Sequence, residues 1–326
     1  MFTKILVPLD GSTLAEQAIG SAAAIARASH GSLELVLVHD PLTFAGFENA
    51  PWDADASTVE REYLENVARE LRDGASISVS QAVLQGAPSD RICEQVGAVH
   101  ADLVVLTSHG RTGLTRAWMG SVANDVLRRA SVPVLVIRPA DETVGRSITR
   151  HLFKRILVTL DGSPLSMAIL PAAEALARCN DATLVLLRVI APVPLFTVDA
   201  GLPIEYPSYV PDDEVTARLV DEAERELAGM VGELSADGIA AEFKVVASER
   251  VARAIADVAA GLHIDAIAMS THGRGMSRLF LGSVADKVLR ASDVPLLLQR
   301  PVQAGRHAPL IEDEGVRAQL PALSGL

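Results

Sequence analysis

The sequence predicts an α/β fold made of two tandem, doubly wound domains, each with a five-stranded parallel sheet of Rossmann-like type. The first reason is length, because 326 residues exceed one ordinary domain. The second is composition, since 49% hydrophobic residues with only 4% aromatics are typical of aliphatic parallel strands covered by helices. The third is an internal repeat: SHGRTGLTRAWMGSVANDVL at 108–127 returns as THGRGMSRLFLGSVADKVL at 271–289.

The repeat extends over nearly the whole chain. KILVPLDGSTLAEQAI at 4–19 matches RILVTLDGSPLSMAIL at 155–170. The period is too long for a solenoid unit, so each copy is expected to be a complete domain. We place the first domain at 1–140 and the second at 153–301. The polar stretch at 140–152 is the expected linker, and 302–326 the expected loose tail.

Within the first copy, apolar runs alternate with amphipathic segments. The expected strands are 5–9, 33–39, 77–83, 103–107 and 132–137, and the expected helices start at Thr13, cover 58–72 and 89–100, and follow Gly120. Thr13 and Glu16 have the spacing of a capping box. The second copy repeats this order, and Pro171 predicts a kink in its first helix. This alternation predicts right-handed crossovers, with ligands beyond the carboxyl ends of the strands.

The charge balance narrows the choice of partners. A net charge of −12 and a pI near 5.1 repel nucleic-acid backbones and anionic lipids, so neither is expected as the main partner. The chain has no apolar run of the ~18 residues that a membrane helix needs, and its start does not resemble a signal peptide. Cys93 and Cys179 lack CxxC spacing, which fits a reducing compartment. We therefore expect a cytoplasmic protein.

The repeated glycine phrase predicts an anion site. Gly110 can let the backbone approach a ligand closely, and Arg111 supplies positive charge. Gly120 and Ser121 open a helix, whose free N–H groups and positive dipole end attract anions. Two structural alternatives remain open: the glycines only form a turn, and Ser121 is only an N-cap. The phrase is neither a Walker sequence nor GxGxxG.

Asp10 and Asp161 end the first strand of each copy, directly before Gly-Ser. One interpretation is an Asx-turn that only shapes the loop. The other is a carboxylate at the ligand crevice that accepts hydrogen bonds from ribose hydroxyls or a base amine. Both interpretations are kept.

Three segments together resemble the universal stress protein family: ILVPLDGS, then SHGRTGL with GSVANDVLR, then VPVLVIR. The resemblance occurs once per copy. Members of this family that bind ATP carry the motif Gly-x2-Gly-x9-Gly-Ser/Thr. It implies ATP as the ligand, with AMP or ADP and a bound Mg²⁺ left open. In this chain the first glycine position is Thr107 and, in the second copy, Ser270, while the second spacer is one residue short.

The resemblance also implies which residues bind the nucleotide. The adenine and ribose end would use the turn after the first strand and the backbone at the end of the second strand. The phosphate end would use the glycine phrase. The implied site residues are Pro8, Asp10, Asp40, Thr107, Gly110, Arg111, Gly120 and Ser121 in copy one, and Asp161, Val189, Gly273, Arg274, Gly282 and Ser283 in copy two. Copy one, with the full-length spacer, is the better ATP candidate.

The family also pairs domains through their last strands, which here are 132–138 and 294–300. The resemblance therefore implies an internal pseudo-dimer, because paired edges cover exposed apolar strands. A further homodimer and an unidentified protein partner are left open.

Three functions are compatible with these residues. The first is a nucleotide-binding stress-response module that acts as a regulator. The second is a protein-interaction module of the same fold without nucleotide, which Thr107, Ser270 and the shortened spacer favour. The third is a slow ATPase. No general base for water activation is evident in the sequence, so we expect no catalytic activity.

Overall fold

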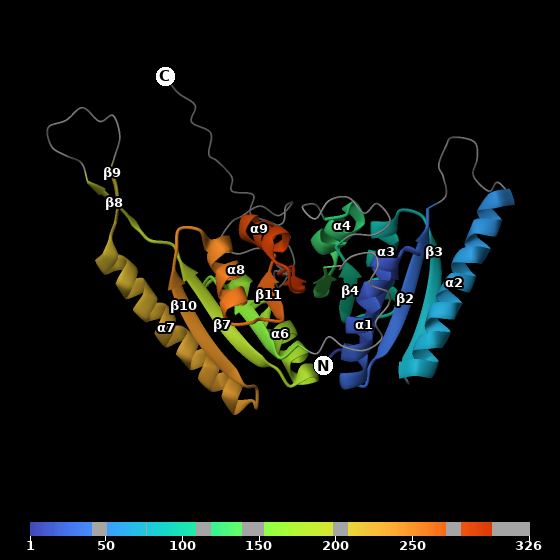
Figure 1. Ribbon diagram of the computed structural model, residues 1–326, viewed down its shortest axis with the longest axis horizontal. Helices are drawn as coiled ribbons and strands as arrows, with labels where there is room; N and C mark the ends of the chain where they lie inside the picture. Colours follow the sequence, from blue (N-terminus) through green and yellow to red (C-terminus); the bar gives the residue numbers. More distant parts are fainter. Residues whose placement is uncertain are drawn as a thin grey trace, which may run out of the picture.

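The computed structural model describes residues 1–40, 51–75, 77–108, 119–138, 153–197, 208–271 and 282–301. Its first half alternates strands and helices as the sequence predicts (Figure 1). The elements are β1 (Lys4–Leu9), α1 (Thr13–Ala28), β2 (Ser32–His39), α2 (Pro51–Ala75), β3 (Ser78–Gln85), α3 (Pro88–Ala98), β4 (Leu103–Thr107), α4 (Ser121–Arg129) and β5 (Val134–Ile137).

The second half repeats this order with two differences. A β-hairpin follows β7 where the second copy is longer, and the first helix is split into α5 and α6. Pro171 lies in the first turn of α6, so the predicted kink is confirmed as a break. The elements are β6 (Arg155–Thr159), α5 (Pro164–Met167), α6 (Leu170–Asn180), β7 (Thr183–Ile190), β8 (Pro194–Thr197), β9 (Ser208–Pro211), α7 (Asp213–Ala236), β10 (Ala241–Ala247), α8 (Val251–Gly261), β11 (Ala266–Ser270), α9 (Ser283–Ala291) and β12 (Leu296–Gln299).

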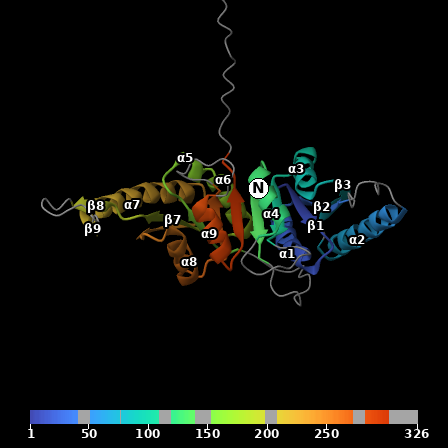
Figure 2. The same cartoon turned by 90° about the horizontal axis from the view of Figure 1, so that it is seen from above.

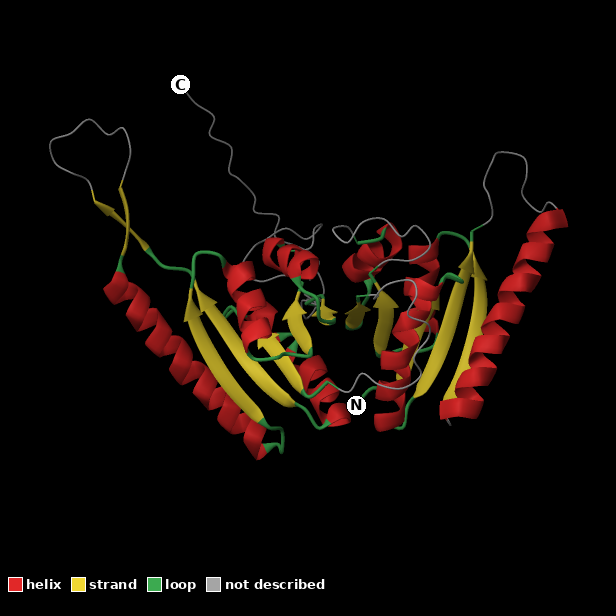
Figure 3. Ribbon diagram, in the orientation of Figure 1, coloured by secondary structure: helices red, strands yellow, loops and turns green. Residues whose placement is uncertain are grey.

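Within the described residues, one sheet runs through both copies in the order β10-β7-β6-β11-β12-β5-β4-β1-β2-β3 (Figures 2 and 3). In this sheet, the pairing is parallel inside each copy. Among the described strands of this sheet, antiparallel pairing occurs where the copies meet, at β12 and β5, with Leu297 opposite Leu135; the separate hairpin of β8 and β9 is also antiparallel. The implied internal pseudo-dimer is therefore confirmed, and each last strand covers the edge of the other.

The core is continuous across this seam. One layer packs α1, α2, α6 and α7 on one face of the sheet, and it includes Leu135 and Leu297 from the two copies. The other layer packs α3, α4, α8 and α9 on the opposite face, and it includes Val134 and Leu296. All four seam residues are at most 1% exposed, so the halves share one hydrophobic core.

The capping-box prediction at Thr13 is wrong by one residue. Ser12 is the N-cap of α1, and its hydroxyl accepts from the Ala15 N–H at 3.1 Å. The Glu16 carboxylate accepts from the Tyr63 hydroxyl of α2 at 2.7 Å. The Asp10 carboxylate binds the Ser12 N–H, which helps hold Ser12 in the extended conformation that an N-cap requires.

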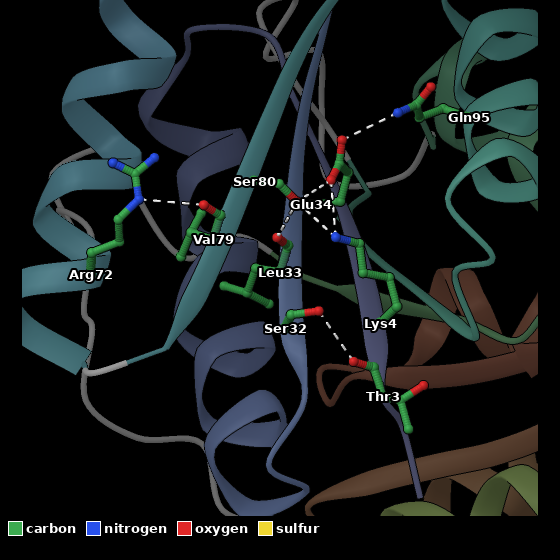
Figure 4. A network of polar contacts seen from close by, with 9 residues as sticks. All are labelled: Thr3, Lys4, Ser32, Leu33, Glu34, Arg72, Val79, Ser80 and Gln95. Atoms are coloured by element: carbon green, nitrogen blue, oxygen red, sulfur yellow. Dashed lines mark hydrogen bonds and ion pairs between the residues drawn. The ribbon is translucent and has the colours of Figure 1, made fainter.

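A buried polar network lies at the amino end of the first copy's strands (Figure 4). The Glu34 carboxylate on β2 is 6% exposed and lies 3.1 Å from the Lys4 ammonium. It also accepts from the Ser80 hydroxyl and, at 3.2 Å, from the Gln95 amide. The acid is thus buried with three partners, as a buried charge requires.

Candidate functional site

Two matching cavities lie at the carboxyl ends of the strands, one in each copy. The first is about 250 Å³ and the second about 290 Å³. Their walls come from the ends of β1, β2 and β4 and the starts of α1, α3 and α4, or from the equivalent elements of copy two. For every described residue that lines the first cavity, the equivalent residue of copy two lines the second cavity. This is the edge at which the fold class predicts a ligand.

The first strand of each copy contributes an aspartate to the cavity wall. Asp10 Oδ1 accepts from the N–H and the hydroxyl of Ser12, at 2.9 and 2.6 Å. Asp161 repeats both bonds with Ser163 at the same distances. The Asx-turn interpretation is therefore confirmed in both copies. Each aspartate nevertheless lines its cavity, so shaping the turn and facing a ligand are compatible roles.

The glycine between aspartate and serine has a conformational reason. Gly11 and Gly162 have φ values of 82° and 79°, a left-handed region that residues with a Cβ rarely adopt. The turn therefore needs glycine at these two positions, whatever binds nearby.

Helix α4 begins at the cavity and directs its N-terminus toward it. Gly120 is the N-cap, and the first intrahelical bond runs from the Asn124 N–H to the Gly120 carbonyl. The preceding N–H groups belong to Ser121, Val122 and Ala123, which all line the cavity. None of the three has a hydrogen-bond partner within the described ranges. These free donors and the helix dipole make the wall electropositive.

The structure decides two points that the sequence left open about this helix start. The Ser121 side chain is not the N-cap, because Gly120 occupies that position, and no described side chain caps the helix. The Gly120 N–H is not free either, because it donates to the Ser108 carbonyl at 2.8 Å. The anion-binding donors would therefore be the three amides after Gly120.

The second copy preserves this arrangement despite its shorter glycine phrase. Gly282 is the N-cap of α9, its N–H donates to the Thr271 carbonyl at 2.8 Å, and Asp286 makes the first intrahelical bond. Ser283 is the first helical residue and lines the second cavity. The missing residue therefore leaves the helix start unchanged.

The glycine at position 120 is not explained by the turn. Its φ of −57° and ψ of 149° are open to any residue. Among the described residues, a Cβ added there would meet nothing closer than the Ser108 carbonyl oxygen, at an ordinary 3.5 Å. The interpretation of Gly120 as a purely structural turn glycine is therefore not supported. Its lack of a side chain leaves space in the cavity that it lines.

Thr107 and Ser270 occupy the position where the family motif has its first glycine. They end β4 and β11, are 7% and 8% exposed, and line the two cavities. The Ser270 hydroxyl donates to the Gln299 carbonyl at 3.4 Å, so it is partly engaged inside the protein. Both positions therefore place a Cβ in the wall.

The structure brings most of the other implied residues together. Pro8 and Val189 line their cavities. Asp40 does not: it is exposed beyond the end of β2, and Val38 lines the cavity instead. The spacing of the repeat could have identified Val38, because it is separated from Val189 by the same interval as Asp10 from Asp161. Gly110, Arg111, Gly273 and Arg274 lie outside the described residues.

Apolar side chains that the sequence did not single out form much of each wall. The first cavity is lined by Val36, Ile92 and Leu106, and the second by the equivalents Leu187, Ile255 and Met269. Each cavity thus combines an apolar part, a carboxylate and a helix N-terminus. Such a combination suits a ligand with a flat apolar group at one end and an anion at the other.

The thiols supply no nucleophile. Burial is the main cause that raises the pKa of Cys93 and of Cys179, so both remain protonated near neutral pH. In the part of the chain that the structure describes, no three His, Cys, Asp or Glu side chains are grouped to hold a metal. Likewise, no helix among the described residues is long and apolar enough to cross a membrane.

Comparison with known proteins identifies the family. The model of the universal stress protein family matches twice, at residues 1–138 and 152–300. Since these two matches cover most of the chain, it belongs to the universal stress protein family, with two tandem copies of the domain. A universal stress protein of Mycobacterium tuberculosis is 32% identical over 203 residues, which are 61% of this chain and 62% of that protein.

Two archaeal universal stress proteins are also similar to this chain, one in sequence and one in structure. A universal stress protein of Methanocaldococcus jannaschii is 29% identical over 141 residues, covering 42% of this chain and 83% of that protein. The crystal structure of a universal stress protein from Archaeoglobus fulgidus aligns with 92% of this chain and 98% of its own, at a TM-score of 0.68 and 19% identity. That structural likeness supports the tandem fold.

Proposed function

We propose that this protein is an adenine-nucleotide-binding regulator of the stress response, with ATP as the preferred ligand. The observation that carries the proposal is the start of α4. Three amides without a partner among the described residues line a cavity beside Gly120, a glycine that neither its backbone conformation nor packing against the described residues requires. The same helix start recurs at Gly282 in copy two.

The chemistry of the wall assigns the parts of the nucleotide. The phosphates would accept from the amides of Ser121, Val122 and Ala123, whose helix dipole favours negative charge. Asp10 would accept from a ribose hydroxyl or the base amine, and the apolar residues of the cavity would contact the adenine. Asp161 and Ser283 would act in the same way in copy two. AMP or ADP remain alternatives, as does a Mg²⁺ ion on the phosphates.

We propose binding without catalysis. The described cavity walls contain carboxylates that are held in Asx-turns, and the thiols are kept protonated by burial. Nucleotide occupancy would instead change the conformation that a protein partner recognises. We propose a cytoplasmic location for this role, in keeping with the net charge of −12.

A second candidate function is a protein-interaction module that binds no nucleotide. It is favoured by Thr107 and Ser270, which place side chains where the family motif has glycine, and by the engaged N–H groups of Gly120 and Gly282. These features reduce the space and the donors that each cavity offers.

Calorimetric titration of the full chain with ATP, ADP and AMP separates the two candidates. We expect two sites of roughly micromolar affinity, since several helix-end contacts of about 0.3–2 kcal/mol would add up on one anion. Gly120→Val should remove the first site and Gly282→Val the second, because the new methyl groups would enter the cavities. Gly97→Val is the control, since a Cβ there meets nothing within 4 Å.

The result that would contradict nucleotide binding is equally clear. If wild-type protein binds none of the three nucleotides and carries none through purification by mass spectrometry, the interaction module is the better account. If ATP binds but all three valine variants bind it equally well, the site lies elsewhere on the chain.

A further inference from the structure

Each copy sends one arginine across the seam between the copies. Arg138 directly follows β5, and its guanidinium donates to the Leu289 carbonyl in the last turn of α9. Arg300 directly follows β12, and its Nη1 donates to the Arg128 carbonyl in the last turn of α4, at 2.9 Å. The two contacts are reciprocal: each copy holds the C-terminal end of the other copy's helix.

The helices held in this way are the ones that line the cavities. α4 and α9 each have nine residues, so about 13 Å separates the arginine at one end from the cavity at the other. A cation at the C-terminal end of a helix and an anion at its N-terminal end both stabilise the same dipole. The arginine of one copy therefore acts on the helix start that faces the other copy's cavity.

A second connection runs from each cavity back to the arginine of its own copy. In copy one, the Gly120 N–H donates to Ser108 at 2.8 Å, and the Ser108 N–H donates to the carbonyl of Ile137 at 2.9 Å. Ile137 is bonded covalently to Arg138. The wall of the first cavity is thus joined, through two backbone hydrogen bonds, to the residue that holds α9.

Copy two contains the same chain of contacts. The Gly282 N–H donates to Thr271 at 2.8 Å, and the Thr271 N–H donates to Gln299, also at 2.8 Å. Gln299 precedes Arg300, which holds α4. The contacts therefore form a closed circuit through both cavities. Its members lie along the seam, where the last strands pair and the two copies share one core.

We propose that Arg138 and Arg300 couple the two cavities, so that nucleotide bound in one raises the affinity of the other. The inference rests on the proposed nucleotide binding and names its regulation. An anion at the start of α4 stabilises this helix, whose C-terminal end accepts a hydrogen bond from Arg300. A more stable α4 would hold Arg300 more firmly, and with it the end of β12 and the adjacent wall of the second cavity. The first ligand thereby orders part of the site that the second ligand must order. By linkage the effect is reciprocal.

The arginines are positioning residues, and their test is a crossed pattern of affinities. ATP is titrated into the full chain with one cavity blocked by Gly120→Val or Gly282→Val. With only the second cavity open, Arg138→Gln should weaken ATP about 5-fold or more, while Arg300→Gln has little effect. With only the first cavity open, the two substitutions should exchange roles. Arg138→Lys should restore part of the loss, because it keeps the positive charge.

Matched controls lie at the same helix ends. Arg129→Gln removes a cation from the end of α4 that pairs with Asp90 inside copy one. Arg290→Gln removes a cation from α9 that pairs with Asp286 on the same helix. Because each of these cations is paired with an acid of its own copy, its loss should change the affinity of either cavity much less than the loss of an arginine that reaches the other copy. In unblocked protein, cooperative binding of two ATP molecules should become independent binding in the Arg138→Gln/Arg300→Gln double variant.

Hydrogen exchange without ligand separates failure of the coupling from failure of nucleotide binding. Arg138→Gln should speed amide exchange in α9 but not in α4, and Arg300→Gln should do the opposite. Unchanged exchange in both helices overturns the arginine contacts themselves. Crossed exchange with no ATP binding overturns the proposed function, and the coupling with it. ATP binding that each arginine weakens only in its own copy, or equally in both, overturns the coupling alone.

Discussion

The two ends of the sheet differ in how well the copies match. At the carboxyl ends, both cavities have equivalent lining residues, the same Asx-turn and the same helix start. At the amino ends they diverge. Glu34 lies on β2 beneath α3, whereas the equivalent Val185 on β7 is 1% exposed and apolar.

Both copies have an acidic side chain at the amino end of the sheet, but on different strands. In copy one the base of β1, Lys4, meets the buried Glu34 on the neighbouring strand. In copy two the equivalent Arg155 pairs with Glu242 on the edge strand β10, where the acid is 47% exposed. Gln95, which bonds Glu34, is replaced by Val258. At the amino end, the copies therefore differ: one has a buried ion pair and the other a half-exposed ion pair, and in both the acid has a partner. At the carboxyl end, both copies keep one arrangement.

Removing the acid should expose the largest difference between the copies. Glu34→Ala leaves the Lys4 ammonium and the Gln95 amide without their partner, so we expect a loss of about 3 kcal/mol in the free energy of unfolding. Glu242→Ala breaks only a half-exposed pair and should lower it by less than about 1 kcal/mol. Urea unfolding of the two variants makes the comparison. Equal losses would show that the two networks are energetically alike.

Variants at the carboxyl end should instead give equal effects. Asp10→Ala and Asp161→Ala each remove the acceptor of two hydrogen bonds within the turn. We expect each to lower the free energy of unfolding by about 1 kcal/mol, and the two values to agree within a few tenths. The same urea experiment measures both. A difference above about 1 kcal/mol would show that the turns are not energetically duplicated.

The smallest effect on the free energy of unfolding is expected when copy one receives the amino-end residues of copy two. The triple variant Glu34→Val/Ser80→Glu/Gln95→Val gives copy one the residues of Val185, Glu242 and Val258. Lys4 can then pair with the new acid on the edge strand. We expect stability within about 1 kcal/mol of wild type, and so well above that of Glu34→Ala. A loss as large as that of Glu34→Ala would mean that α3 requires the buried acid.

Local sequence rules identified the elements but misplaced contacts by one or two residues. The apolar runs located the strands, and Pro171 located the break between α5 and α6. The capping box failed at Thr13 because Asp10 binds Ser12 and makes it the cap. Asp40, from which the resemblance implied a backbone contact, lies beyond the residues that line the cavity, which Val38 lines instead. The cap depends on side-chain direction, which spacing along the chain does not give.

By itself, the sequence determined the duplication, the alternation of strands and helices, and the family, because hydrophobic periodicity and repeated motifs are local properties of the chain. It also indicated that Gly120 and Gly282 begin helices. Only the tertiary structure decided which amides at those helix starts are already engaged, and that Arg138 and Arg300 reach the opposite copy's helix. The two arginine contacts join residues more than 150 positions apart, and their geometry depends on the antiparallel pairing of β5 with β12.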